Sequence, residues 1–271
     1  MVPDMSGNPI ANFKEAQRQG WKHFAPLEAL TTRPAAHLVQ FAQVRRGQRV
    51  LDVACGTGVV AITATRVGAK VTGVDLTPEL LERARENARI GSFDVEFLEA
   101  DVEALPFANA EFDVVLSQFG HMFAPRPQVA IAEMLRVLKP AGTLAFATWP
   151  PELLIGASFA LVGRYMPPPP PGVSPPPQWG DVHIVRERLG EAVKNIVFDR
   201  GCMFSPALSI ANHRNHLEKT AGPMLKLVDM LSASDPAGLA EFRREYDTLV
   251  APYFADNVVR QDYLLTRATK C

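Results

Sequence analysis

Short apolar runs alternate with amphipathic stretches along the middle of the chain, between Arg49 and Trp149. Runs such as "RVLDVA" and "FDVVLSQ" are apolar at consecutive positions, which is typical of strands covered by helices on both faces. Between them lie stretches with helical spacing, such as "PELLERARENARI". Strand and helix alternating in this way predict parallel strands with right-handed crossovers, and therefore a doubly wound α/β fold.

The pattern changes before this region. Residues 8–46 have helical spacing, and we expect Pro26 and Pro34 to divide them into separate helices because proline interrupts a helix interior. We therefore divide the chain into an N-terminal helical region, 1–46, and a main domain, 47–271.

The pattern changes again after Trp149. Residues 167–177, "PPPPPGVSPPP", contain eight prolines and predict a stiff extended connector. A helix capped by Asp181 should follow. Residues 207–255 then carry three helical stretches without strand signals, before a final strand in "NVVRQDYLLTRATK". We interpret 207–255 as a helical cap inserted ahead of the last strand.

Composition restricts the class of protein. The 271 residues are 47% hydrophobic and 21% charged, which suits one large globular core. A formal net charge of -1 provides no broad field for nucleic acid or an anionic membrane, and no apolar run approaches about 18 residues. The three cysteines are far apart and form no CxxC pair, so neither disulfides nor zinc are suggested. We expect a cytoplasmic protein that binds neither nucleic acid nor membrane, while its oligomeric state stays open.

A glycine-rich loop follows the first predicted strand in "VLDVACGTGVVA". Gly56 and Gly58, with Thr57 between them, allow backbone amides to approach a ligand because no Cβ intervenes. The next strand ends in Asp75, 17 residues past Gly58. An acidic residue at this place can accept hydrogen bonds from both hydroxyls of a ribose. The spacing therefore predicts a nucleoside site.

Asp52 distinguishes between two nucleoside cofactors, a dinucleotide and S-adenosylmethionine. A carboxylate beside the loop would repel a pyrophosphate but attract the ammonium of a methionine tail. The third strand is followed by Asp101 and Val102. A side-chain acceptor and the next backbone amide can together bind an adenine edge. These residues favour S-adenosylmethionine.

The sequence resembles the class I S-adenosylmethionine-dependent methyltransferases, type 11, and within them the small-molecule branch of the ubiquinone and menaquinone methyltransferases. The motifs "VLDVACGTG", "VTGVDLTPELLERAREN", "DVEALPFANAEFDVVLSQFG" and "AEMLRVLKPAGTLAFATW" carry this resemblance over residues 49–149. It implies a Rossmann-like sheet of seven strands with an antiparallel last strand. It also implies S-adenosylmethionine as cofactor and a small organic molecule as methyl acceptor, with O-, N- or C-methylation all open.

The resemblance further implies a set of cofactor contacts. Gly56 and Gly58 would approach the methionine portion, and Asp75 would bind the ribose. Leu76 would cover one face of the adenine, and Asp101 with Val102 would bind its edge. Gln118 would lie under the sulfonium. In similar enzymes the N-terminal region folds over the cofactor as a lid. Trp21 could then lie near the sulfonium as a cation–π partner, although a core tryptophan would have the same sequence pattern.

His121, after the fourth strand, is the candidate general base for an acceptor that must lose a proton, because neutral imidazole is available near pH 7. A histidine that only shapes the pocket is the alternative. His213 and His216 are three residues apart on a predicted helix, but without a nearby cysteine we expect no metal site. In the "KPAG" turn, Gly142 is the residue expected to supply any positive φ.

Two other functions fit parts of this pattern. One is an NAD(P)-dependent oxidoreductase with a Rossmann fold, which Asp52 disfavours. The other is a nucleoside-binding protein without turnover, which would bind the cofactor but release no S-adenosylhomocysteine with any acceptor.

Overall fold

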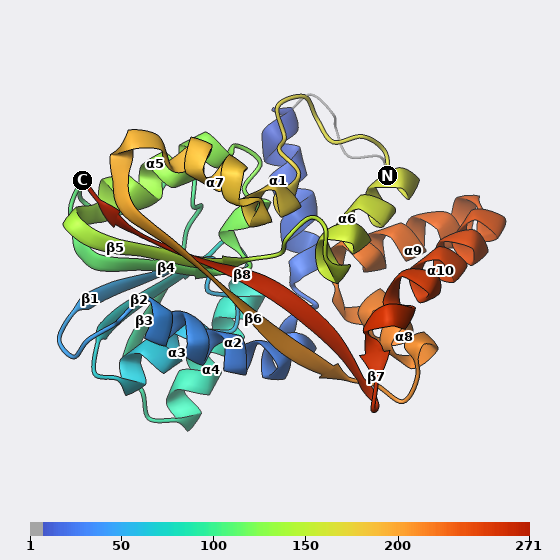
Figure 1. The fold of residues 1–271 in the computed structure, drawn as a ribbon, viewed down its shortest axis with the longest axis horizontal. Helices are drawn as coiled ribbons and strands as arrows, with labels where there is room; N and C mark the ends of the chain where they lie inside the picture. Colours follow the sequence, from blue (N-terminus) through green and yellow to red (C-terminus); the bar gives the residue numbers. More distant parts are fainter. Residues whose placement is uncertain (1–7) are drawn as a thin grey trace.

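The computed structural model describes residues 8–271, in which all the strands form one twisted sheet (Figure 1). Along the sheet the strand order is β3-β2-β1-β4-β5-β8-β6, and a further two-residue strand, β7, pairs with β8. The strands are β1 (Arg49–Val53), β2 (Lys70–Asp75), β3 (Val95–Glu99), β4 (Phe112–Gln118), β5 (Leu138–Thr148), β6 (Val193–Pro206), β7 (Phe254–Ala255) and β8 (Val258–Lys270).

The strand directions confirm the predicted fold class. Strands β1 to β5 pair in parallel, whereas β8 runs antiparallel to both β5 and β6. The seven strands on the main path therefore include one reversed strand, which is the last long strand of the chain. The order reverses at β1, where β2 lies on one side and β4 on the other. Ligands of open parallel sheets bind at such a reversal, beyond the carboxyl ends of the strands.

Helices cover both faces of the sheet. On one face lie α2 (Glu28–Phe41), α3 (Val59–Arg66) and α4 (Pro78–Ile90), and on the other lie α5 (Pro127–Val137) and α7 (Val182–Leu189) (Figure 1). Asp181 caps α7 as predicted, because its carboxylate accepts hydrogen bonds from the amides of His183 and Ile184, at 2.8 and 3.3 Å. Central strands such as β1 are buried because both faces are covered.

The N-terminal region differs from the prediction at one proline. Helix α1 (Pro9–Trp21) ends before Pro26, which lies in a short 3₁₀ helix, but Pro34 lies inside α2. Pro34 was expected to end a helix and does not. It is buried on the same helix as Ala35 and Leu38, which belong to the sheet core, so tertiary packing offsets the lost backbone hydrogen bond.

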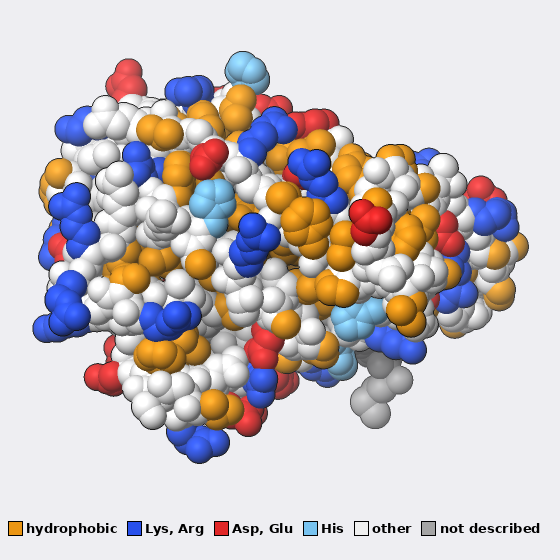
Figure 2. Space-filling view, turned by 60° about the horizontal axis from the view of Figure 1, so that its bottom comes forward, with side chains coloured by type: hydrophobic (Ala, Val, Ile, Leu, Met, Phe, Trp, Pro, Cys, Tyr) orange, Lys and Arg blue, Asp and Glu red, His pale blue; other side chains and the backbone are white. Residues whose placement is uncertain are grey.

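A smaller helical lobe extends beyond the sheet. It contains α6 (Leu154–Tyr165), α8 (Ile210–Thr220), α9 (Gly222–Ser234) and α10 (Pro236–Val250), the last three being the helical stretches expected within 207–255. The lobe has its own hydrophobic core. Strands β6 and β8 reach from the sheet to this lobe (Figure 1), and Figure 2 shows hydrophobic side chains among basic ones at the join between the two lobes. Within residues 8–271 no helix has the length and apolar character needed to span a bilayer.

The "KPAG" turn at the start of β5 also differs from the prediction. Ala141, not Gly142, has the positive φ, +58°. Gly142 is required by space instead, because a Cβ there would lie 2.6 Å from Leu138 Cδ1 and 2.8 Å from the Lys139 carbonyl oxygen. Ala141 therefore holds a left-handed backbone conformation that disfavours any residue with a Cβ.

Candidate functional site

A cavity of about 270 Å³ lies at the carboxyl ends of the central strands, between the sheet and the helical lobe. Nine of the eleven residues predicted for the site line this cavity. They are Trp21, Asp52, Gly56, Thr57, Asp75, Leu76, Asp101, Val102 and Gln118. The other two, Gly58 and His121, are not among the lining residues. The fold therefore gathers residues from α1 and from the ends of β1 to β4 into one space.

Asp52, on β1, is fully buried yet has an unused acceptor. Its Oδ2 accepts a hydrogen bond from the Ala61 amide at 3.0 Å, while its Oδ1 has no partner among residues 8–271. Burial raises the pKa of Asp52 well above its usual range; the Ala61 hydrogen bond lowers it and nearby Asp75 raises it further. A buried carboxylate oxygen without a partner is costly, and a ligand ammonium would satisfy it.

The two glycines of the loop have different roles. Gly56 has φ +54°, and a Cβ built on it would meet nothing within 4 Å, so its backbone borders open space in the cavity. Gly58 has φ +81°, and its Cβ would lie 2.9 Å from the Phe97 ring and 3.1 Å from Ala84 Cβ. Gly58 thus permits close packing of the loop on the sheet, and Gly56 leaves room for a ligand.

Asp75, at the end of β2, ties two loops together. Its Oδ2 accepts from the Gly56 amide and its Oδ1 from the Thr77 amide, both at 2.8 Å. Burial raises the pKa of Asp75, and these two hydrogen bonds act in the opposite direction. Each carboxylate oxygen can accept a second hydrogen bond, so the position is compatible with ribose hydroxyls.

Asp101 forms an ion pair with Lys14, which the sequence pattern does not single out. Its Oδ1 accepts from the Glu103 amide at 2.9 Å, and its Oδ2 lies 2.5 Å from Nζ of Lys14 on α1. Lys14 also lies 2.5 Å from Glu103, whose carboxylate binds Arg126 at 2.7 Å. This ion-pair group fastens α1 beside the predicted adenine position. The sequence pattern of an amphipathic helix does not distinguish a lysine that forms such an ion pair from one that is exposed to solvent.

Gln118 and aromatic residues line the cavity beyond β4. Gln118 donates from Nε2 to the Thr31 carbonyl at 2.9 Å, while its buried Oε1 has no partner within 8–271. Phe119 has φ +58°, which is unusual for an aromatic residue, and its ring stacks on Trp149 with centroids 3.9 Å apart. Trp21 lies 4.6 Å from Phe123, centroid to centroid. The strained backbone at Phe119 could be found only in three dimensions.

His121 does not lie where a base is needed. Its amide donates to the Ser117 hydroxyl at 3.1 Å in the turn after β4, and its ring packs between Phe146 and Trp179, at 4.6 and 4.8 Å. The ring is fully buried, and burial lowers the pKa of His121 to about 3. A general base must reach the proton it removes. The prediction of His121 as a base therefore does not agree with the structure, which places it in the core.

The two histidines of α8 also lie outside the main cavity. His213 is buried, with Nδ1 3.3 Å from Oγ of Ser205, and burial lowers its pKa to about 4. His216 borders a separate polar depression with it. Across residues 8–271, no cluster of three or more His, Cys, Asp or Glu side chains is arranged to hold a metal ion.

Comparison with known proteins agrees with this geometry. Residues 51–146 match the family described as "Methyltransferase domain". The uncharacterized protein Rv1403c of Mycobacterium tuberculosis is 36% identical over 235 residues, 86% of this chain and 85% of its own. The demethylmenaquinone methyltransferase of Thermus thermophilus is 39% identical over 128 residues, 46% of this chain and 57% of its own. The structure of the YcgJ protein from Bacillus subtilis shares the fold, with a TM-score of 0.59 and 18% identity, covering 88% of this chain and 98% of that one.

The fold is thus Rossmann-like, and the cavity at its carboxyl-terminal edge is compatible with a nucleoside cofactor. The chain belongs to the class I S-adenosylmethionine-dependent methyltransferases, and S-adenosylmethionine is its cofactor. The cavity fits this cofactor in two respects that are independent of sequence similarity. A buried carboxylate oxygen of Asp52 has no partner within 8–271, and Gly56 borders open space where any other residue would place a Cβ.

Proposed function

We propose that the protein transfers the methyl group of S-adenosylmethionine to a small, largely apolar organic molecule. The observation that carries this proposal is the continuity of the cavity. The lining that begins at the strand ends, around Asp52 and Asp75, continues into apolar side chains of the helical lobe, such as Val162 and Met224. One continuous lining can therefore contact both a cofactor and an acceptor.

In this proposal the cofactor lies along the ends of the first three strands. Asp52 binds the ammonium of the methionine tail, and the backbone around Gly56 and Thr57 borders the same tail. Asp75 accepts from the ribose, Leu76 covers one face of the adenine, and Asp101 with Val102 binds its edge.

Gln118 and Trp21 would lie toward the methyl group. When bound, S-adenosylmethionine supplies a positively charged sulfonium whose methyl group is open to attack by a nucleophile. The unpartnered Oε1 of Gln118 presents a partial negative charge that would stabilise a cation nearby. The aromatic rings of Trp21 and Phe119 would exclude water and favour a positive charge at their faces.

The chain's contribution to the rate would then be mainly positional. Holding the attacking atom about 3–3.5 Å from the methyl carbon in a space without water accounts for a large part of many such rate enhancements. We propose that α1 acts as a lid over the cofactor and that α8 to α10 close the acceptor end. Lys14, paired with Asp101, would hold the lid in place.

The test is a transfer assay with methyl-labelled S-adenosylmethionine. Purified protein is incubated with a bacterial extract divided into three fractions: small organic molecules, nucleic acid and protein. We expect label in the fraction of small organic molecules, with release of S-adenosylhomocysteine in equal amount. Label in nucleic acid or protein would contradict the proposed acceptor class.

The cofactor is titrated in parallel by calorimetry, with NADH as a comparison. Tight binding of S-adenosylhomocysteine without product in any fraction would instead favour a nucleoside-binding protein without turnover. A clean titration by NADH, with no heat from S-adenosylhomocysteine, would contradict the assignment of the cofactor.

A further inference from the structure

A buried polar residue interrupts an apolar row on β8. Alternate residues of a strand face the same side, and here Val259, Gln261 and Tyr263 are all at most 3% exposed. Val259 belongs to the core of the helical lobe and Tyr263 to the core of the sheet, so Gln261 lies where the two cores meet. Gln261 also lines the cavity. A buried carboxamide destabilises a protein unless something bonds to it, so its presence in this row requires an explanation.

A second polar group interrupts the buried face of α10. Leu239, Phe242, Tyr246 and Val250, spaced by three or four residues, form that face, and Tyr246 alone among them has a hydroxyl. Tyr246 lines the cavity and is 1% exposed. A tyrosine hydroxyl is protonated at neutral pH, and burial raises the pKa of Tyr246 further, so this hydroxyl can donate a hydrogen bond.

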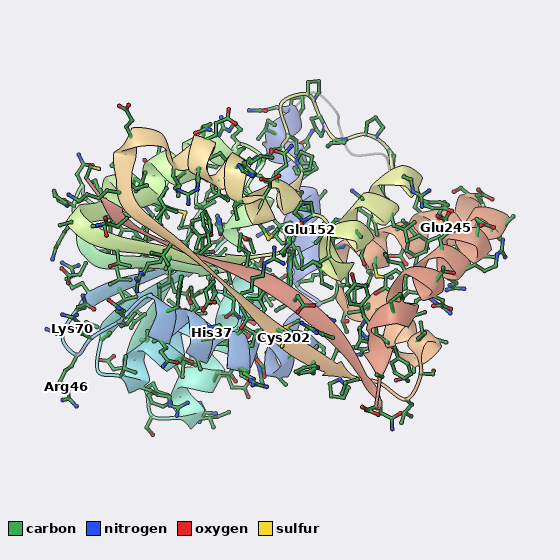
Figure 3. The ribbon with its side chains drawn as sticks, in the orientation of Figure 1. His37, Arg46, Lys70, Glu152, Cys202 and Glu245 are labelled. Atoms are coloured by element: carbon green, nitrogen blue, oxygen red, sulfur yellow. The ribbon has the colours of Figure 1, made fainter. Side chains whose placement is uncertain are left out.

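Ser158 is a third polar residue in an apolar setting. It lies on α6 among the buried residues Leu154, Leu161 and Val162, and it lines the same cavity. Its hydroxyl donates to the Leu154 carbonyl at 2.7 Å, and its helix α6 packs against α10, which carries Tyr246. Figure 3 labels Glu245, the neighbour of Tyr246 on α10, and Cys202 on β6, which pairs with Asp262 beside Gln261.

Charge divides the cavity into two parts. All of its charged lining residues come from α1 or from the ends of β1, β2 and β3: Lys14, Arg18, Asp52, Asp75 and Asp101. The lining residues from α6, β6, β8 and the segment from α8 to α10 are uncharged: Ile155, Ser158, Phe159, Val162, Met203, Leu217, Ala221, Pro223, Met224, Tyr246 and Gln261. An ionised acceptor would be desolvated in the second part without an opposite charge from these residues.

We propose that Ser158, Tyr246 and Gln261 form a polar subsite that binds a hydroxyl or carbonyl group of an uncharged, otherwise apolar methyl acceptor. This inference rests on the proposed function, because it assigns the uncharged part of the cavity to the acceptor. The apolar walls provide most of the binding free energy, and the three polar groups select which acceptor is held. An acceptor without the polar group leaves buried hydrogen-bonding atoms unpaired and binds more weakly.

The test compares two probes that differ by one hydroxyl, naphthalene and 2-naphthol, with 2-naphthoate as a charged third. Their binding is measured by equilibrium dialysis with saturating S-adenosylhomocysteine. We expect 2-naphthol to bind the wild-type protein about three- to tenfold more tightly than naphthalene, the effect of one or two hydrogen bonds. The 2-naphthoate anion should bind more weakly than naphthalene.

The variants Tyr246→Phe and Gln261→Leu each remove one polar group at nearly constant volume. Each should reduce the preference for 2-naphthol, and the double variant should abolish it, while the affinity for naphthalene stays within about twofold. Tyr165→Phe is the matched control. Tyr165 lies on α6 outside the cavity lining, with its hydroxyl 2.5 Å from Glu245 Oε1, so this variant should keep the full preference.

Equal affinity for naphthalene and 2-naphthol, binding of neither probe, or a preference that persists in the double variant would each overturn the inference. The affinity of every variant for S-adenosylhomocysteine is measured in parallel. If the wild-type protein does not bind S-adenosylhomocysteine, the proposed function itself is contradicted. A normal affinity with no preference for 2-naphthol would contradict only the polar subsite.

Discussion

Asp52→Asn should weaken cofactor binding and change stability in a direction that depends on pH. The amide retains an oxygen that can accept from the Ala61 amide, so the hydrogen bond of 3.0 Å can persist. The negative charge is lost, and with it the partner we propose for the ammonium of the cofactor. A hydrogen bond to a charged group contributes about 1.5–3 kcal/mol, which corresponds to about a 10- to 160-fold rise in Kd for S-adenosylhomocysteine.

In the absence of cofactor, Asp52→Asn should stabilise the protein relative to wild type, and increasingly so as pH rises. The pKa of Asp52 is raised in the folded state, so the folded protein binds this proton more tightly than the unfolded chain. Wild-type protein therefore loses unfolding free energy as pH rises above about 3.9, the ordinary carboxyl pKa, and asparagine does not. The difference in Tm, variant minus wild type, should be larger at pH 8 than at pH 4.5.

Calorimetric titration and thermal unfolding at the two pH values measure these effects. Asp94→Asn is the matched control, because Asp94 is exposed on the surface outside the cavity lining and the same charge change should alter neither quantity. An unchanged Kd for S-adenosylhomocysteine would refute the role given to Asp52. A Tm difference that shrinks as pH rises would refute the attribution of its raised pKa to burial.

Two further predictions concern residues where the structure differed from the sequence interpretation. His121→Phe should leave the affinity for S-adenosylhomocysteine unchanged and reduce the loss of stability in acid. Because the pKa of His121 is lowered to about 3 in the folded protein, the wild type loses unfolding free energy as pH falls from about 6.5 to about 3. This loss amounts to up to about 1.4 kcal/mol per pH unit, and the phenylalanine variant lacks it. Unfolding by urea across that range measures the difference, and parallel pH profiles would contradict it. Ala141→Gly should raise the unfolding free energy by about 0.5–1 kcal/mol because it relieves a φ of +58°. Ala64→Gly, inside helix α3, should instead lower it by at least about 1 kcal/mol, because glycine disfavours a helix and the lost methyl group is buried. A stability loss in both variants, measured by the same denaturation, would show that Ala141 is not strained.

The sequence by itself determined the parts that depend on local pattern. Consecutive apolar positions and the spacing of the glycine loop were enough to predict parallel strands whose ends carry Asp52, Asp75 and Asp101. Those ends must meet at one edge of a parallel sheet, which is why most of the predicted cofactor residues line one cavity. The helix cap at Asp181 was equally local, because it depends on the residue and the amides just after it.

Only the tertiary structure decided where side chains point and which distant residues meet. His121 follows β4 as expected, but the turn hydrogen-bonded to Ser117 directs its ring into the core. Pro34 remains within a helix because burial against the sheet outweighs its local preference. Tyr246 and Gln261 are 15 positions apart in the sequence and belong to a helix and a strand, so no spacing rule relates them. They line one cavity because β8 extends from the sheet core into the core of the helical lobe, a contact that depends on packing rather than on local sequence.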